Sequence, residues 1–232
     1  MAVSTRERIH ILQIKLLQWY AQHGRDLPWR QTRDPYQILV SEIMLHQTQV
    51  NRVIPKFQEW LKAYPTFEAL ATAPIEEVQQ LWRPLGYNFR PLRLHQIAKF
   101  VVKEHQGNLP KKMEQLLALP GIGRYTAGAL LSFAFHKDAP IVDTNIRRVI
   151  QRIFGVKENP MRGVGKKRIW QLAEAMIPES KAYIFNQALI DFGALLCTAK
   201  NPRCSDCFVK KICIWSESAC YKKQLVHVLK TN

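Results

Sequence analysis

The placement of the cysteines is the feature that most constrains this chain. All five lie between Cys197 and Cys220, and four of them form a C-x6-C-x2-C-x5-C run: Cys197, Cys204, Cys207 and Cys213. A secreted disulfide scaffold would distribute its cysteines along the chain, so this clustering indicates a metal site in a reducing, intracellular compartment. Four thiolate ligands suit either a tetrahedral zinc ion or an iron–sulfur cluster.

Hydrophobic periodicity predicts an all-α fold. Apolar residues recur at helical spacing in nine windows, and no long alternating pattern typical of strands competes with them. The windows are 8–20, 36–45, 52–62, 92–103, 113–118, 126–135, 143–153, 167–176 and 183–196. Pro or Gly interrupts the chain between most of them, as expected for turns between helices. The 232 residues can bury one core or two small lobes.

The charge balance indicates a polyanionic partner. The chain has 34 Lys and Arg against 18 Asp and Glu, a net charge of +16. Nucleic acid is the first candidate, and a basic surface that serves only solubility is the alternative. The sequence has no run of about 18 apolar residues, and its start lacks the apolar stretch of a secretory signal. We therefore expect an intracellular protein without a membrane partner.

Two further segments contain candidate functional groups. Residues 119–135 begin with a Gly-x-Gly turn that leads into a helix, and such a turn lets backbone N–H groups approach an anion. Taken alone, this turn is equally consistent with a simple helix connection. Residues 27–53 place Glu42 in an apolar helical stretch, where a carboxyl group has a raised pKa and can act as a general acid. The alternative is a glutamate on the solvent face.

Together, these motifs resemble the helix-hairpin-helix DNA glycosylases of the endonuclease III and MutY superfamily, in the family's order and from about residue 27 to 213. The cysteine intervals are those of the family's 4Fe–4S cluster loop. The resemblance implies an all-α, two-lobed helix-hairpin-helix DNA glycosylase fold with a C-terminal 4Fe–4S cluster loop. It places a six-helix barrel with the hairpin at residues 22–135, and the cluster domain at residues 1–21 plus 136–232.

The same resemblance assigns functional residues. Glu42 matches a catalytic acid, Asp143 the catalytic aspartate, and Tyr125 the position at which bifunctional enzymes carry an attacking lysine. Because tyrosine forms no Schiff base, no AP lyase activity is expected. The residues implied to contact substrate or DNA are Arg30, Gln47, Thr48, Tyr87, Gly121, Gly123, Arg124, Asn145 and Gln187. Arg147, Arg148 and the lysines of the cluster loop are further candidates for phosphate contacts.

The chain resembles two subfamilies, which differ in the base that they excise. The SEIML and QTQV segments, Tyr87 and Gln187 favour adenine, because a carboxamide can pair with an adenine edge. Thymine or uracil opposite guanine is favoured by the TRDPYQIL segment and by the length, since the chain stops soon after the cluster loop and lacks the second domain of typical MutY proteins. His46, Asn88 and Leu39 also depart from the MutY pattern.

We favour adenine opposite guanine or 8-oxoguanine. The predicted enzyme is a monomer that excises the base from mispaired double-stranded DNA in base excision repair. The alternative of another class is a non-catalytic helix-hairpin-helix DNA-binding module, which would need neither Glu42 nor Asp143.

Overall fold

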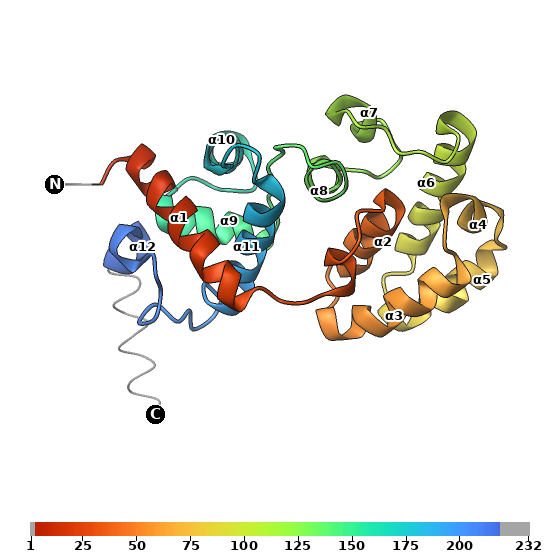
Figure 1. The fold of residues 1–232 in the computed structure, drawn as a ribbon, viewed down its shortest axis with the longest axis horizontal. Coiled ribbons are helices and arrows are strands. Elements are labelled where there is room, and N and C mark those ends of the chain that lie inside the picture. Colours follow the sequence, from red (N-terminus) through yellow and green to blue (C-terminus); the bar gives the residue numbers. More distant parts are fainter. Residues whose placement is uncertain (1–2, 219–232) are drawn as a thin grey trace. The chain divides into compact units, whose positions relative to one another are not determined.

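A computed structural model describes residues 3–218, and every regular element within them is helical (Figure 1). The all-α prediction is therefore confirmed. The chain divides into two compact units. The central unit contains residues 26–137, and the terminal unit contains the residues up to 25 together with those from 138 onward. None of the described helices is both long enough and apolar enough to cross a membrane.

The central unit consists of short helices joined by turns. Its elements are η1 (Pro28–Arg30), α2 (Pro35–Leu45), α3 (Val50–Ala63), α4 (Phe67–Thr72), α5 (Ile75–Trp82), η2 (Arg83–Leu85), α6 (Phe89–His105), α7 (Met113–Leu117), α8 (Arg124–Ala129) and the π-helix η3 (Leu130–Ala134). The helical window at 126–135 is thus divided between α8 and a π-helix that continues it. Apolar periodicity does not distinguish these two hydrogen-bonding patterns.

Helix α2 forms the centre of this unit's core. Its N-cap is Asp34, whose side chain accepts a hydrogen bond from the Tyr36 backbone N–H at 2.8 Å. The Tyr36 hydroxyl in turn accepts a hydrogen bond from Trp60 Nε1 on α3, at 3.1 Å. Eight of the eleven residues of α2 are buried, as expected for a helix surrounded by others. Glu42 is one of the eight, so the fold itself carries this carboxyl group into the interior.

The terminal unit combines the two ends of the chain. Its described elements are α1 (Thr5–His23), α9 (Thr144–Phe154), α10 (Gly163–Met176), α11 (Ala182–Leu195), η4 (Lys210–Ile212) and α12 (Ile214–Glu217). The ring of Trp19 on α1 stacks on Phe208 with 5.7 Å between centroids, and Arg8 donates a hydrogen bond to the Ile212 carbonyl. Helix α1 therefore anchors the segment that carries the four cysteines.

A buried ion pair holds Arg25, which lies two residues after the end of α1. The Asp191 side chain on α11 is fully buried, and its carboxylate accepts hydrogen bonds from the Arg25 backbone N–H at 2.9 Å and from Arg25 Nε at 2.8 Å. The Arg25 side chain keeps 26% exposure. Because one carboxylate satisfies both the backbone and the side chain of Arg25, this pair determines where the chain leaves the terminal unit.

Asp191→Ala should lower the free energy of unfolding by about 3 kcal/mol, the lower end of the range for a broken buried pair, because Arg25 keeps some contact with water. Chemical denaturation measures the change. Glu174→Ala, at an exposed position on α10, is the matched control and should stay within about 0.5 kcal/mol of the wild type. Equal stability of the two variants would contradict a structural role for the pair.

Candidate active site

Glu42 lies on α2, near the C-terminal end of the helix, and is only 5% exposed. The side chain is therefore buried and does not lie on the solvent face. A carboxyl group removed from water favours its neutral form unless hydrogen bonds stabilise the anion. Glu42 is the candidate proton donor of the central unit.

The turn between α7 and α8 forms the hairpin. Gly121 has a φ of +76°, and a Cβ atom at this residue would lie 2.3 Å from the Arg93 side chain, so only glycine fits. Gly123 is the N-cap of α8, and no atom lies within 4 Å of the position that its Cβ would take. Gly121, Gly123 and Arg124 are all exposed. The start of α8 is thus exposed, and phosphate binding there stays a prediction.

The hairpin helix brings Tyr125 close to the end of α2. The Tyr125 ring is half-buried, and its centroid lies 6.2 Å from that of the His46 imidazole. His46 remains in contact with solvent, but partial burial of its ring, together with the positive charges of Arg90 and Arg93, lowers its pKa. This shift favours the neutral imidazole at neutral pH.

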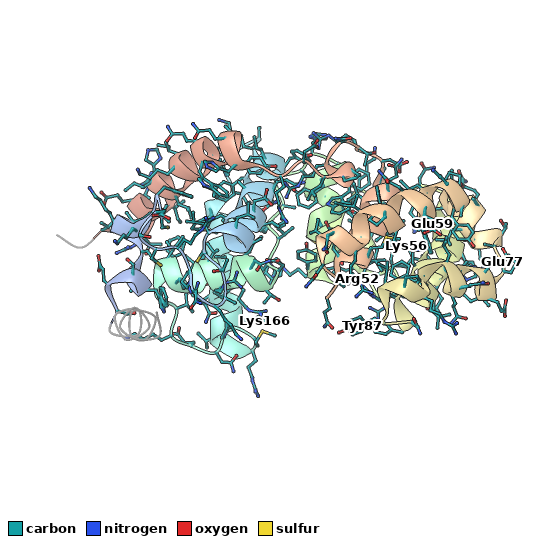
Figure 2. All side chains as sticks on the ribbon, turned by 90° about the horizontal axis from the view of Figure 1, so that it is seen from below. Arg52, Lys56, Glu59, Glu77, Tyr87 and Lys166 are labelled. Carbon is teal, nitrogen blue, oxygen red and sulfur yellow. The ribbon has the colours of Figure 1, made fainter. Side chains whose placement is uncertain are left out.

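Three of the predicted DNA contacts lie on two turns of the central unit. Gln47 and Thr48 follow α2, and Tyr87 precedes α6 with half of its surface exposed. In Figure 2, Tyr87 lies along the same edge of this unit as Arg52, which donates a hydrogen bond to the Pro84 carbonyl. The structure thus brings together side chains that are about 40 positions apart in the sequence.

In the terminal unit, Asp143 is the N-cap of α9. Its Oδ1 accepts a hydrogen bond from the Ile146 backbone N–H at 2.6 Å, and its Oδ2 accepts one from Asn145 Nδ2 at 3.1 Å. Burial raises the pKa of the Asp143 carboxyl group, and these hydrogen bonds together with Arg148 oppose the increase. The carboxylate is therefore held in one orientation, in surroundings that only partly stabilise its charge.

Arg148 connects Asp143 to the cluster loop, residues 197–213. Its guanidinium donates hydrogen bonds to Asn145 Oδ1 at 2.9 Å, to the Gly193 carbonyl at 2.6 Å and to the Cys197 carbonyl at 2.9 Å. A Cβ atom on Gly193 would lie 2.8 Å from the Asn145 Cβ, so the glycine permits the close approach of α9 and α11. The sequence suggested Arg148 as a phosphate contact, but its guanidinium instead binds carbonyl groups of its own chain.

The four cysteines of the cluster loop line one cavity. Burial raises the pKa of the Cys207 thiol to about 12 and also raises that of Cys213. Among the described residues, no three His, Cys, Asp or Glu side chains are grouped as a single metal ion requires. Four soft thiolate ligands around one cavity are the donor set that an iron–sulfur cluster requires. Cys220 lies outside the described residues.

The remaining predicted residues lie in different surroundings. Arg30 is half-buried on η1 of the central unit. Gln187 lies on α11 of the terminal unit and is 4% exposed. Arg90, on α6, was not singled out from the sequence, although it is 2% exposed and bonded to both DNA-contact turns. No sequence motif marks it, because its hydrogen-bond partners are mainly backbone carbonyl groups.

Comparison with known proteins identifies two matching families. A family described as HhH-GPD superfamily base excision DNA repair protein matches residues 40–175. The iron–sulfur binding domain of endonuclease III matches residues 197–213, which are the four cysteines and the residues between them.

Whole-chain relatives include enzymes named for two different bases. An adenine DNA glycosylase of Homo sapiens is 42% identical over 207 residues, which are 85% of this chain and 38% of the relative. The corresponding enzyme of Mycolicibacterium smegmatis is also 42% identical, over 85% of this chain and 67% of the relative. A thymine-DNA glycosylase of Aeropyrum pernix is 36% identical, over 90% of this chain and 95% of the relative. The chain thus spans less than half of the human enzyme.

Among solved structures, a thermostable thymine-DNA glycosylase superposes with a TM-score of 0.86 at 34% identity, covering 92% of this chain and 98% of that one. A non-covalent endonuclease III–DNA complex gives a TM-score of 0.79 at 23% identity, a likeness of fold alone. The chain belongs to the HhH-GPD superfamily of base excision DNA repair proteins and carries the iron–sulfur binding domain of endonuclease III. Within the superfamily it is similar both to adenine and to thymine DNA glycosylases.

The purified protein should be brown and contain about four irons per chain. Cys207→Ser should lose the iron and the visible absorbance, because it removes one of the four thiolates that line the cavity. Cys220→Ser, outside the four-cysteine run, should keep both. Iron analysis and absorbance spectra measure these outcomes, and one zinc per chain without visible absorbance would contradict the cluster.

Asn145→Ala should raise the pKa of Asp143 further, because it removes a hydrogen bond that stabilises the carboxylate. If the carboxylate is the active form, activity is lost as pH falls through this pKa, so the acid limb of the pH profile should move to higher pH. Carbon NMR of the Asp143 carboxyl group against pH measures the shift directly. Thr144→Ala, at the exposed neighbouring position, is the control, and an unchanged pKa in Asn145→Ala would contradict the interaction.

Proposed function

We propose that this protein is a monofunctional DNA glycosylase that hydrolyses the N-glycosidic bond of a mispaired base flipped out of duplex DNA. The observation that carries the proposal is the Asp143 carboxylate, which two hydrogen bonds hold in one orientation at the N-cap of α9. A DNA-binding module has no need of a carboxylate kept partly buried, which costs free energy and repels phosphate. Membership of the HhH-GPD superfamily and the net charge of +16 support duplex DNA as the partner.

In this proposal, Asp143 and Glu42 act in opposite protonation states. The Asp143 carboxylate stabilises the positive charge that develops on the sugar as the glycosidic bond lengthens, or attacks the sugar carbon to form a covalent intermediate. Buried Glu42 donates its proton to N7 of a flipped adenine, so the base leaves as a neutral molecule. Water supplies the hydroxyl group that ends on the sugar carbon. Cys197, Cys204, Cys207 and Cys213 would hold an iron–sulfur cluster that would stabilise the fold of their loop, and glycosidic hydrolysis itself requires no electron transfer.

Tyr125 is the reason for proposing a glycosylase without AP lyase activity. Strand cleavage through a Schiff base requires a neutral amine within reach of the sugar carbon, and a phenol cannot form that bond. Tyr125 instead lies at the start of the hairpin helix, facing the imidazole of His46. This pair can line the base pocket of the central unit.

Adenine is the preferred substrate, on the strength of the relatives named adenine DNA glycosylase at 39–42% identity. Thymine or uracil opposite guanine is the second candidate. A specific observation favours it, because the thermostable thymine-DNA glycosylase superposes over 98% of its own length with a TM-score of 0.86. Pyrimidines have no N7, so Glu42 would then orient water or hydrogen-bond to the pyrimidine edge.

One panel of labelled duplexes tests both the reaction and the base. We expect release of adenine opposite 8-oxoguanine and opposite guanine, with strand cleavage only after alkali, and no release from matched pairs. Release from G·T and G·U alone would show that the excised base is thymine or uracil and would leave the proposed glycosylase reaction unchanged. No release from any duplex, with cluster and DNA binding intact, would favour the non-catalytic module. Strand cleavage without alkali, or borohydride trapping of a covalent complex, would contradict the role given to Tyr125.

A further inference from the structure

Gln47 and Tyr87 are exposed residues of the central unit that have left-handed backbone conformations. Gln47 has a φ of 57° and Tyr87 a φ of 52°, and neither is a glycine. Such a conformation costs a non-glycine residue on the order of 1 kcal/mol and persists only where the surroundings impose it. Both residues are also among those that the resemblance to DNA glycosylases implies to contact substrate or DNA. The structure must therefore contain something that holds both turns.

Arg90 provides this restraint on the turn after α2. Its Nη1 donates a hydrogen bond to the His46 carbonyl at 2.6 Å, and its Nη2 donates one to Thr48 Oγ1 at 3.0 Å. These two acceptors flank Gln47 directly. The same Nη1 also meets the carbonyls of Ile43 at 3.1 Å and Met44 at 2.9 Å. The guanidinium therefore caps the helix that carries Glu42 as well as the turn that carries Gln47.

The same guanidinium also holds the turn before α6, through the nitrogen that bonds to Thr48. Nη2 donates hydrogen bonds to the carbonyls of Leu85 and Gly86, both at 3.1 Å. The Tyr87 ring lies over the guanidinium carbon at 5.1 Å and the Trp82 ring at 5.3 Å, so two aromatic faces enclose the cation. The hydrogen bonds to the backbone before Tyr87 and the contact with its ring thus both hold Tyr87 in place.

Arg90 satisfies these groups at the cost of burying a charge. It is 2% exposed, and no carboxylate pairs with it in residues 3–218. A buried cation without a counter-ion is expensive, and it is retained only where oxygen acceptors surround it. Only arginine offers planar donors that reach acceptors on two sides at once, whereas a lysine is a single point charge.

We propose that Arg90 is a positioning residue that holds Gln47 and Tyr87 at a fixed distance and orientation for reading distorted DNA. The inference rests on the proposed function and adds to it that Tyr87 enters the base stack and Gln47 contacts the duplex beside it. A protein that opens a duplex inserts a side chain between base steps and must supply the free energy of unstacking, so the inserted side chain has to be held in place relative to its neighbours. One guanidinium bound to both turns makes them move as one body.

The test compares Arg90→Lys with Arg83→Lys, the same substitution at an exposed position on η2. The probe is a duplex with a tetrahydrofuran abasic analogue opposite guanine, which needs no excision, beside an intact duplex of the same sequence. For Arg90→Lys we expect preference for the abasic duplex to fall about tenfold or more, with intact-duplex binding and iron content unchanged. Arg83→Lys should keep the full preference. Equal preference in the two variants would overturn the proposal, whether or not the wild type releases any base.

Hydrogen exchange of the wild-type protein tests the proposal independently, and it can be measured even if Arg90→Lys does not fold. The proposal predicts that the peptides covering residues 43–48 and 85–90 are protected to the same extent and open together. Exchange of either segment within seconds, at the rate of a free surface loop, would overturn it. Because this measurement involves no DNA, its outcome is independent of the proposed glycosylase activity.

Discussion

The terminal unit depends on the hydrogen bonds of one guanidinium group. Arg148 joins the side chain of Asn145, the carbonyl of Gly193 and the carbonyl of Cys197, and thereby fixes α9, α11 and the start of the cluster loop to one another. Asn145 passes this constraint on to the carboxylate of Asp143. The start of the cluster loop and the orientation of Asp143 are therefore linked through side-chain hydrogen bonds.

In the central unit, too, one arginine guanidinium binds backbone carbonyl groups from several elements. Arg90 sits among the carbonyl groups at the end of α2 and before α6, as Arg148 sits among carbonyls of α11 and the cluster loop. The last carbonyls of a helix lack partners within the helix, and a guanidinium satisfies several of them at once. Part of the large positive charge of this chain is consequently structural. Only the exposed remainder is available to phosphates, among it Arg124 of the hairpin.

Sequence reasoning found the long helices because several turns repeat the apolar period. It missed α4 and α5, which have six and eight residues, although it found the five-residue α7, because the apolar period is weakly marked in helices of one or two turns. The apolar neighbours of Glu42 alone did not decide between burial and exposure, and the resemblance to MutY glycosylases favoured the buried carboxyl group that the structure shows. The inward orientation of Arg148 and the role of Arg90 could not be predicted, because their partners are mostly backbone carbonyls, which every residue possesses. The left-handed turns at Gln47 and Tyr87 were equally hidden, since neither residue is a glycine.

In the proposed mechanism, the Asp143 carboxylate acts on the sugar in addition to capping α9. Asn at this position keeps the size of the side chain and an oxygen that can cap α9, but it carries no charge. The most direct test is single-turnover base release by Asp143→Asn, with Asp206→Asn at an exposed position of the cluster loop as the control. We predict that Asp143→Asn binds duplex DNA as the wild type does and releases base at least about a thousandfold more slowly. Release at the wild-type rate would contradict the proposed mechanism.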